Sequence, residues 1–133
     1  MKKVFLLVLF PALMIGQYKN VKVGESAPAH RGICEPSISI NKKDPQNVTA
    51  GAILDKVFYS NDGGLTWTGD TLKSSYGVWG DPVLISDFEG NQYFFHLSDH
   101  TGENWKSEEI LDRIVCQKST DGGKTWNDGS YMG

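Results

Sequence analysis

Two of the carboxylates that stand directly before a proline in this 133-residue chain also stand at the start of a strand-like run, and they are candidates for acid–base chemistry. Glu35 precedes Pro36 and Asp81 precedes Pro82, and a strand-like run begins at each proline. Paired carboxyl groups supply the acid and the base or nucleophile of glycosidic bond hydrolysis. The alternative is structural, in which the proline fixes the start of the strand while the acid caps it or faces water. The pattern leaves both interpretations open.

Four residues near one another in the sequence are of types that bind metal ions, namely His96, Asp99, His100 and Glu103. Their spacing is not that of a known metal site, and the stretch runs from a strand-like segment into a loop. We therefore expect a solvated loop, no metal site and no cofactor.

Three aromatic residues, Tyr76, Trp79 and Trp105, are candidates for stacking on sugar rings. Packing between sheets explains these aromatic residues equally well, and the sequence does not distinguish the two roles.

Cys34 and Cys116 either form a disulfide, which an exported protein permits, or are small buried side chains. No histidine is placed in sequence to activate either thiol.

An eight-residue pattern, Ser60–Trp67, occurs again as Ser119–Trp126. Its aspartate accepts hydrogen bonds from the N–H groups that follow, and its paired glycines allow the positive φ of a reversing chain. Its threonine hydroxyl bonds back to the aspartate, and its tryptophan ties the turn to the sheet. We therefore expect the same self-satisfied hairpin turn twice, with these structural positions: Ser60, Asp62, Gly64, Thr66, Trp67, Ser119, Asp121, Gly123, Thr125 and Trp126.

Strand-like runs flank both copies in the same order, which predicts an all-β chain. In the first unit they are Pro36–Ile40, Val48–Leu54, Val57–Ser60 and a fourth run that begins at Trp67. In the second unit they are Pro82–Ser86, Gln92–Leu97 and Arg113–Ser119, and the chain stops in or before a fourth. The insertion Ser98–Asp112 contains Trp105–Leu111, for which one or two helical turns are expected.

The repeated pattern resembles the Asp-box, or BNR repeat, of sialidases and other β-propeller proteins, over roughly residues 33–133. The resemblance implies a sialidase-type propeller, with about two of an expected six four-stranded blades present, at about 34–75 and 80–133. In that family the box joins the third and fourth strands of a blade, at the periphery and away from the active site. The innermost strands line a central channel, so Glu35 and Asp81 are expected to face that channel.

The resemblance also implies a protein that acts on glycans. It implies that this chain is the N-terminal fragment of a longer protein, which is a glycoside hydrolase of exo-sialidase type. Sialidases bind the substrate carboxylate with three arginines, and here the first arginine position reads Cys34 while the second falls near Leu54. A non-catalytic propeller of the cell envelope that binds glycan or protein is therefore the alternative. We expect the 133-residue chain by itself to be inactive, because an incomplete channel does not hold the catalytic groups in place.

The N-terminus reads as a secretory signal over residues 1–16, followed by an irregular segment, 17–33. Lys2 and Lys3 precede the apolar run Val4–Ile15, which is too short to span a bilayer. We expect a secreted, periplasmic or envelope protein with no transmembrane segment after cleavage near Gly16. The formal net charge of −3 and the absence of a basic stripe argue against nucleic-acid binding.

Overall fold

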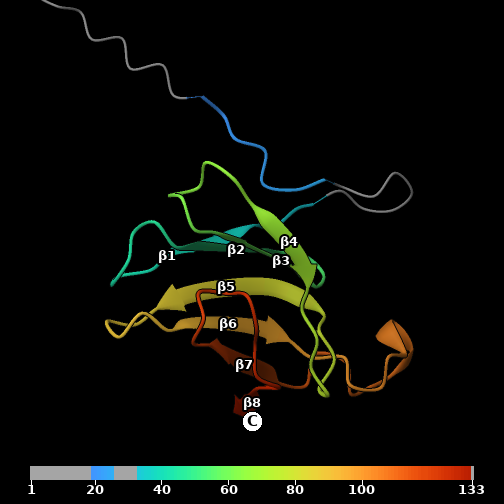
Figure 1. The fold of residues 1–133 in the computed structure, drawn as a ribbon. Helices are drawn as coiled ribbons and strands as arrows, with labels where there is room; N and C mark the ends of the chain where they lie inside the picture. The colour runs from blue at the N-terminus through green and yellow to red at the C-terminus, as the bar shows by residue number, and fades with distance from the viewer. Residues whose placement is uncertain (1–18, 26–32, 133) are drawn as a thin grey trace, which may run out of the picture.

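A computed structural model describes residues 19–25 and 33–132 of the chain. These residues form eight β-strands and one short 3-10 helix, so the protein is all-β as the sequence predicts. Figure 1 shows the strands in two separate layers, each a four-stranded antiparallel sheet. The expected signal segment, residues 1–16, lies outside the described residues.

Strand order follows the sequence in both sheets. The first sheet contains β1 (Ser37–Ile40), β2 (Val48–Ala52), β3 (Lys56–Ser60) and β4 (Thr68–Thr71). The second contains β5 (Gly80–Ser86), β6 (Gln92–Leu97), β7 (Ile114–Ser119) and β8 (Ser130–Met132). Seven of the thirteen predicted strand ends coincide with these, including both ends of β6, and the other six differ by one or two residues.

The insertion between β6 and β7 departs from the sequence-based expectation. Its helical turn, η1, covers Asn104–Lys106, so it begins one residue earlier than the predicted stretch Trp105–Leu111 and is shorter. Leu111 instead takes a left-handed backbone conformation with φ of 60° and donates its N–H to Ser98 O at 3.0 Å. No helix within residues 19–25 and 33–132 has the length and apolar character to cross a membrane.

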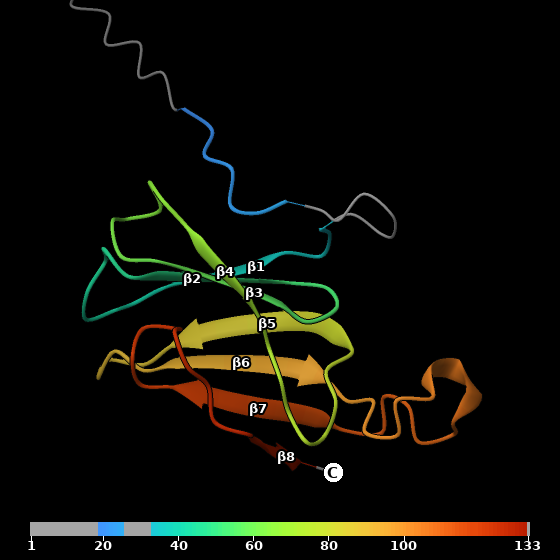
Figure 2. The same cartoon turned by 45° about the vertical axis from the view of Figure 1, so that its right-hand side comes forward.

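The two sheets stack face to face, with β5 packed over β1 and β2 (Figure 2). Side chains alternate along β5, so Leu84 points into this interface while Val83 points away from it. Val57 and Leu72 from the first unit meet Leu84 and Phe94 from the second in the buried core. Burial of these side chains from water is the main force that holds the sheets together.

Polar groups fix how the sheets align. The Leu84 N–H donates to Ser37 Oγ at 3.0 Å, and the Lys42 N–H donates to Ser86 Oγ at 3.2 Å. The buried Asn47 side chain donates to the Gly122 carbonyl of the second sheet at 2.9 Å. Because buried polar groups are costly when unpaired, these bonds specify one sheet-to-sheet alignment.

The first repeated turn joins β3 to β4 and closes on itself. Ser60 Oγ donates to Asp62 Oδ1 at 2.7 Å and accepts the Gly64 N–H at 2.9 Å. The same carboxylate accepts the N–H and the hydroxyl of Thr66 at 2.9 and 2.6 Å. The Trp67 indole donates to Gly64 O at 2.9 Å. These bonds hold the pKa of Asp62 down at about 2, with the Thr66 hydroxyl as the largest cause.

The second turn joins β7 to β8 and repeats the pattern. The hydroxyl of Ser119 donates to Asp121 at 2.8 Å, and Asp121 accepts the Thr125 hydroxyl at 2.6 Å. The Trp126 indole donates to Gly123 O at 3.1 Å. In both turns the aspartate oxygens are used by the turn itself, so neither turn presents a ligand site.

Candidate functional site

The two acids singled out from the sequence meet at one end of the stacked sheets. Glu35 lies just before β1, and Asp81 is the second residue of β5. Asp81 lies close enough to Glu35 to raise the pKa of its carboxyl group, and both residues are exposed. The sheet registers place this end opposite the repeated turns, because Ser37 pairs with Gly51 whereas Ile40 pairs with Val48.

Both acids have the same unusual backbone conformation. Glu35 has φ of 51° and Asp81 has φ of 50°, a left-handed region that side chains other than glycine rarely adopt. Non-glycine residues held in this region cluster at functional sites. Each acid is followed by a proline at the start of its sheet, so two separate strands present their carboxyl groups in the same way.

Contact with Asp81 raises the pKa of Glu35 above its usual range. The hydrogen bond between the side chains is the largest cause, followed by desolvation and by the charge of Asp81. Glu35 therefore holds its proton to a higher pH than a separate glutamate does. A protonated acid beside a carboxylate is a pair of groups that can donate and accept a proton.

Backbone contacts position the starts of both strands. The Ile53 N–H donates to Cys34 O at 3.2 Å, which ties the residue before Glu35 to the end of β2. Gly80 has φ of 110°, and a Cβ there would stand 3.2 Å from Ile53 Cβ. This close approach brings the start of β5 against the β2–β3 turn.

A cleft formed by two tryptophans adjoins the carboxyl pair. Trp79, which precedes Gly80, meets Trp105 of the insertion with ring centroids 5.7 Å apart and ring planes at 88°. The cleft has a volume of about 390 Å³ and is lined by Ile53, Leu54, Asp55, Lys56, Trp79, Asn104 and Trp105. The Lys56 ammonium donates to Asp55 Oδ1 at 2.7 Å in this lining.

Tyr76, the third aromatic candidate, does not join the cleft. Its ring packs edge-on against Tyr131 of β8 with centroids 5.3 Å apart. Its carbonyl accepts the Asp99 N–H at 3.2 Å. Tyr76 is therefore a packing residue, whereas Trp79 and Trp105 line an open site.

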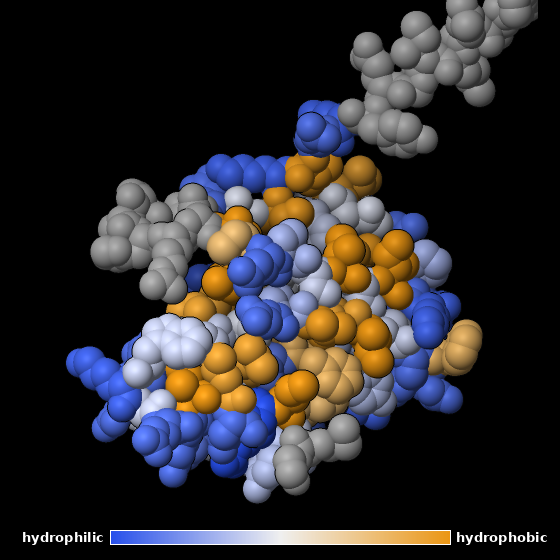
Figure 3. Space-filling view, turned by 180° about the vertical axis from the view of Figure 1, so that it is seen from behind, coloured by the Kyte–Doolittle hydropathy of each residue, from blue (hydrophilic) through white to orange (hydrophobic). Residues whose placement is uncertain are grey.

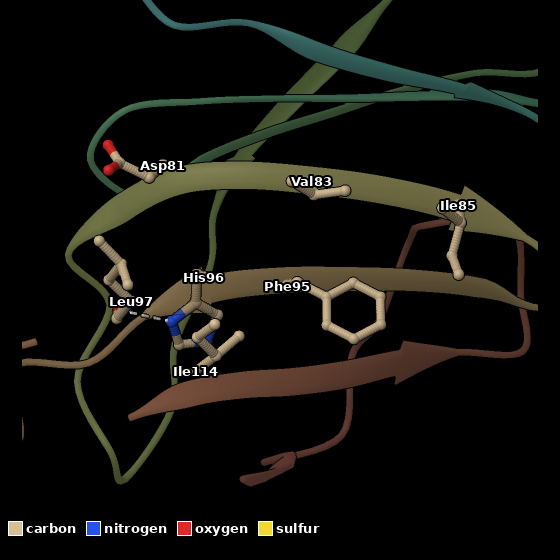
Figure 4. A pocket seen from close by; sticks show the side chains of 7 residues that line it. All are labelled: Asp81, Val83, Ile85, Phe95, His96, Leu97 and Ile114. Atoms are coloured by element: carbon tan, nitrogen blue, oxygen red, sulfur yellow. Dashed lines mark hydrogen bonds between the residues drawn. The ribbon is translucent and has the colours of Figure 1, made fainter. Parts of the chain in front are cut away.

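An apolar face of the second sheet begins at Asp81. Val83, Ile85 and Ile114 are 54%, 49% and 56% exposed on this face. In Figure 4, Asp81, Val83 and Ile85 follow one another along β5, while Phe95 lies on the neighbouring β6 and Ile114 on β7. They line a hollow of about 460 Å³. Figure 3 shows that exposed hydrophobic side chains also gather on the back of the molecule.

His96 lies in β6, within the predicted strand Gln92–Leu97, whereas Asp99, His100 and Glu103 lie beyond its end. Its side chain is buried, with Nδ1 2.9 Å from Leu97 O and Nε2 3.2 Å from Gln117 Oε1. Burial lowers the pKa of His96 below its usual value. His100 lies apart from it and pairs with Glu109 at 2.9 Å. The described residues contain no cluster of three potential metal ligands.

Cys34 is exposed, Cys116 is half-buried, and both are free thiols. Burial raises the pKa of the Cys116 thiol, which keeps it protonated and weakly nucleophilic. Cys34 adjoins Glu35 at the position where the family resemblance leads us to expect an arginine.

Arg113 is the one arginine within residues 33–132, and it is already engaged. Its guanidinium makes a bidentate pair with Asp112 and lies 4.5 Å from the centre of the Tyr131 ring. It lines neither the cleft nor the apolar hollow. The described part of the site thus offers three carboxyl groups, two indoles, a lysine and an amide.

Sequence reasoning did not identify Asp55 and Asn104 as site residues. Asp55 sits in a tight turn, and Asn104 belongs to a loop whose path depends on tertiary packing. The only local signal for Asn104 was its residue type. Its backbone has a positive φ of 57°, which asparagine tolerates better than most residues. Comparison of the chain with models of protein families, with curated protein sequences and with solved structures gave no match.

Proposed function

We propose that the two sheets are consecutive blades of an exported, sialidase-like Asp-box propeller that acts on glycans. The observation that carries this proposal is the meeting of Glu35 and Asp81 at the end of the sheets opposite the repeated turns. In a propeller of this type the first strand of each blade lines the central channel, and these acids stand at the starts of both first strands.

Three features support the propeller. Both sheets have the order of a blade, with strands that follow one another across the sheet. Both carry the same hydrogen-bonded turn between the third and fourth strands. The outer face of each sheet is partly apolar, with Ile38 and Val83 exposed, and a further blade on either side would cover it.

Glycoside hydrolysis is the activity we propose for such a propeller. The raised pKa of Glu35 beside Asp81 provides a group that can protonate a leaving oxygen. Glycosidases hold their two carboxyl groups about 5–9.5 Å apart, and a hydrogen-bonded pair is closer than that. The pair therefore acts as a single acid unit, and hydrolysis requires a nucleophile or base from another part of the protein.

Glycan binding without hydrolysis is the second candidate, and a specific observation favours it. The resemblance predicts arginines where Cys34 and Leu54 stand, and Arg113 is engaged with Asp112 and Tyr131. Without these guanidinium groups the described residues lack the bidentate partner that a sugar carboxylate prefers. Binding of neutral glycans requires no such partner.

Two assays on the purified chain test the proposal. We expect binding to an immobilised glycan panel and no turnover of a fluorogenic sialoside, since hydrolysis requires a nucleophile or base that the carboxyl pair does not supply. Turnover that disappears in Glu35→Gln would establish hydrolysis by this chain. Failure to bind any glycan and failure to turn over any glycoside would together contradict a glycan-directed function.

Export is tested separately, by N-terminal sequencing of the mature protein from its native host. We expect the first residue to lie near Gln17, beyond the apolar run. A mature protein that retains Met1 would contradict export through a cleaved signal.

A further inference from the structure

We propose that the cleft between Trp79 and Trp105 is a binding subsite for an uncharged pyranose unit of a glycan. This inference rests on the proposed glycan-directed function and names the class of sugar that the site takes. It is carried by the ring geometry, the exposure of Trp105 and the charges in the cleft wall.

The two indoles form a right-angled corner. Their ring planes meet at 88° with centroids 5.7 Å apart, so the face of one ring and the edge of the other border the same space. A pyranose ring has apolar faces made of C–H groups and a rim of hydroxyl groups. Its C–H face can stack on an indole face while the rim extends toward the polar wall.

Packing alone does not account for Trp105. Its side chain is 69% exposed, although tryptophan is highly buried on average in globular proteins. Trp67 and Trp126 are partly buried and donate their indole N–H groups to glycine carbonyls. Trp105 therefore has a large apolar surface that is open to solvent and available to a ligand.

The polar wall of the cleft suits hydroxyl groups. Asp55 accepts hydrogen bonds, Lys56 donates them, and the amide of Asn104 does both. The side chains of Asp55 and Lys56 remain 35% and 45% exposed, so a ligand can reach them. Sugar hydroxyls both donate and accept, and a mixed wall can bind several of them at once.

Charge balance favours a neutral sugar over an acidic one. The ammonium of Lys56 is 2.7 Å from Asp55 Oδ1, so the pair presents almost no net charge to a ligand. A sialic acid carboxylate would compete with Asp55 for Lys56 at the cost of leaving Asp55 unpaired. The volume of about 390 Å³ lies within the range of about 300–1,000 Å³ typical of small-molecule pockets.

The indole signals of the four tryptophans allow a direct test by ¹H–¹⁵N NMR of the full chain. The probes are methyl β-D-galactopyranoside, methyl β-D-glucopyranoside and N-acetylneuraminic acid. We expect at least one neutral glycoside to shift the Trp79 and Trp105 signals in a saturable way. The Trp67 and Trp126 signals should stay in place, and N-acetylneuraminic acid should bind more weakly than the neutral probe.

Variants then separate the cleft from the rest of the protein. Trp105→Ala and Asp55→Asn should each weaken binding of that glycoside at least tenfold. Both residues are accessible, so folding should survive, and NMR dispersion verifies this. Phe88→Ala is the matched control, because Phe88 is an 81% exposed aromatic residue in the β5–β6 turn, outside the cleft. It should bind as the unaltered chain does.

The outcomes distinguish this inference from the proposed function. Saturable sugar binding that is unchanged in both Trp105→Ala and Asp55→Asn would overturn the cleft assignment and leave a glycan-directed function intact. Tighter binding of N-acetylneuraminic acid than of either neutral glycoside would overturn the preference for an uncharged sugar. If neither these probes nor the glycan panel bind to the unaltered chain, the inference and the proposed function both fail.

Discussion

Gly51 of β2 lies directly against the phenyl ring of Phe94 in β6. A Cβ built on Gly51 would stand 2.5 Å from Cε2 and 2.8 Å from Cζ of that ring. Phe94 is fully buried, so its ring has no free space into which it can move. The missing side chain at position 51 is therefore what allows the two sheets to pack this closely.

Gly51→Ala should lower the free energy of unfolding by about 1–3 kcal/mol, the typical cost of overpacking a core. Gly51 is in a strand and has no positive φ, so steric overlap and not backbone strain causes the loss. Urea unfolding followed by tryptophan fluorescence measures the change. In the double variant with Phe94→Leu, the total loss should be smaller than the sum of the single losses by more than about 0.5 kcal/mol.

Thr68→Ala is the control for this pair, because Thr68 is exposed on β4 and a change there should stay within about 0.5 kcal/mol. Strict additivity of Gly51→Ala and Phe94→Leu would mean that the two residues do not press on each other, contrary to the packing described.

The repeated turns could be predicted in detail because their physics is local. Asp62 finds all its partners within four residues, from Ser60 to Thr66, so the sequence pattern contains the whole hydrogen-bond network. The strands could be predicted for a similar reason, since alternation along β5 shows which side chains face the core. Local rules of this kind do not depend on how the two sheets meet.

The contacts of the candidate site depend on sheet packing and loop path, and they could not be predicted. Glu35 and Asp81 stand in similar sequence contexts, yet they come together only because β5 stacks against β1. Trp105 reaches Trp79 only because the insertion folds back over the β2–β3 turn. The burial of His96 could not be predicted either, because its partner Gln117 lies on a neighbouring strand, β7.

Ser119→Ala tests the inner hydrogen bond of the second repeated turn. The Ser119 side chain is 1% exposed, and its hydroxyl accepts the Gly123 N–H at 2.9 Å. Removal of the hydroxyl leaves this buried N–H without a partner, which costs about 1–3 kcal/mol. Thermal and urea unfolding should both report this loss.

Thr120→Ala, at the exposed neighbouring position, is the matched control and should change the stability by less than about 0.5 kcal/mol. Equal effects of Ser119→Ala and Thr120→Ala would show that the serine hydroxyl does not support the turn.

Acid should destabilise the protein through the aspartates that close turns. Hydrogen bonds lower the pKa of Asp62 to about 2, chiefly from the Thr66 hydroxyl, and that of Asp87 to about 2, chiefly from Asn91. Both folded-state values lie below the ordinary value of 3.8, so the unfolded chain binds more protons in this range. The stabilisation is complete above pH 3.8 and is lost as the pH falls toward 2.

Melting temperatures measured from pH 6 to pH 2 test this dependence. Asp62→Asn should give a shallower decline between pH 4 and pH 2 than the unaltered chain. Leu65→Ala changes the same turn at a 71% exposed residue without removing an ionisable group, so its decline should stay parallel. An Asp62→Asn curve that is parallel to the unaltered chain would contradict the lowered pKa.

Glu35 should have the opposite pH dependence. Its hydrogen bond with Asp81 raises the folded-state pKa above the ordinary 4.5, so the folded chain binds the extra proton. This contribution to stability is complete below pH 4.5 and is lost as the pH rises through the folded-state pKa of Glu35.

Carbonyl ¹³C NMR of Glu35 should report the raised pKa, and Asp81→Asn should return this pKa toward 4.5. In Glu35→Gln the part of the fall in melting temperature that Glu35 causes above pH 4.5 should be absent. A Glu35 pKa that is unchanged by Asp81→Asn would show that the two carboxyl groups do not share a proton, and the acid unit of the proposed site would be lost.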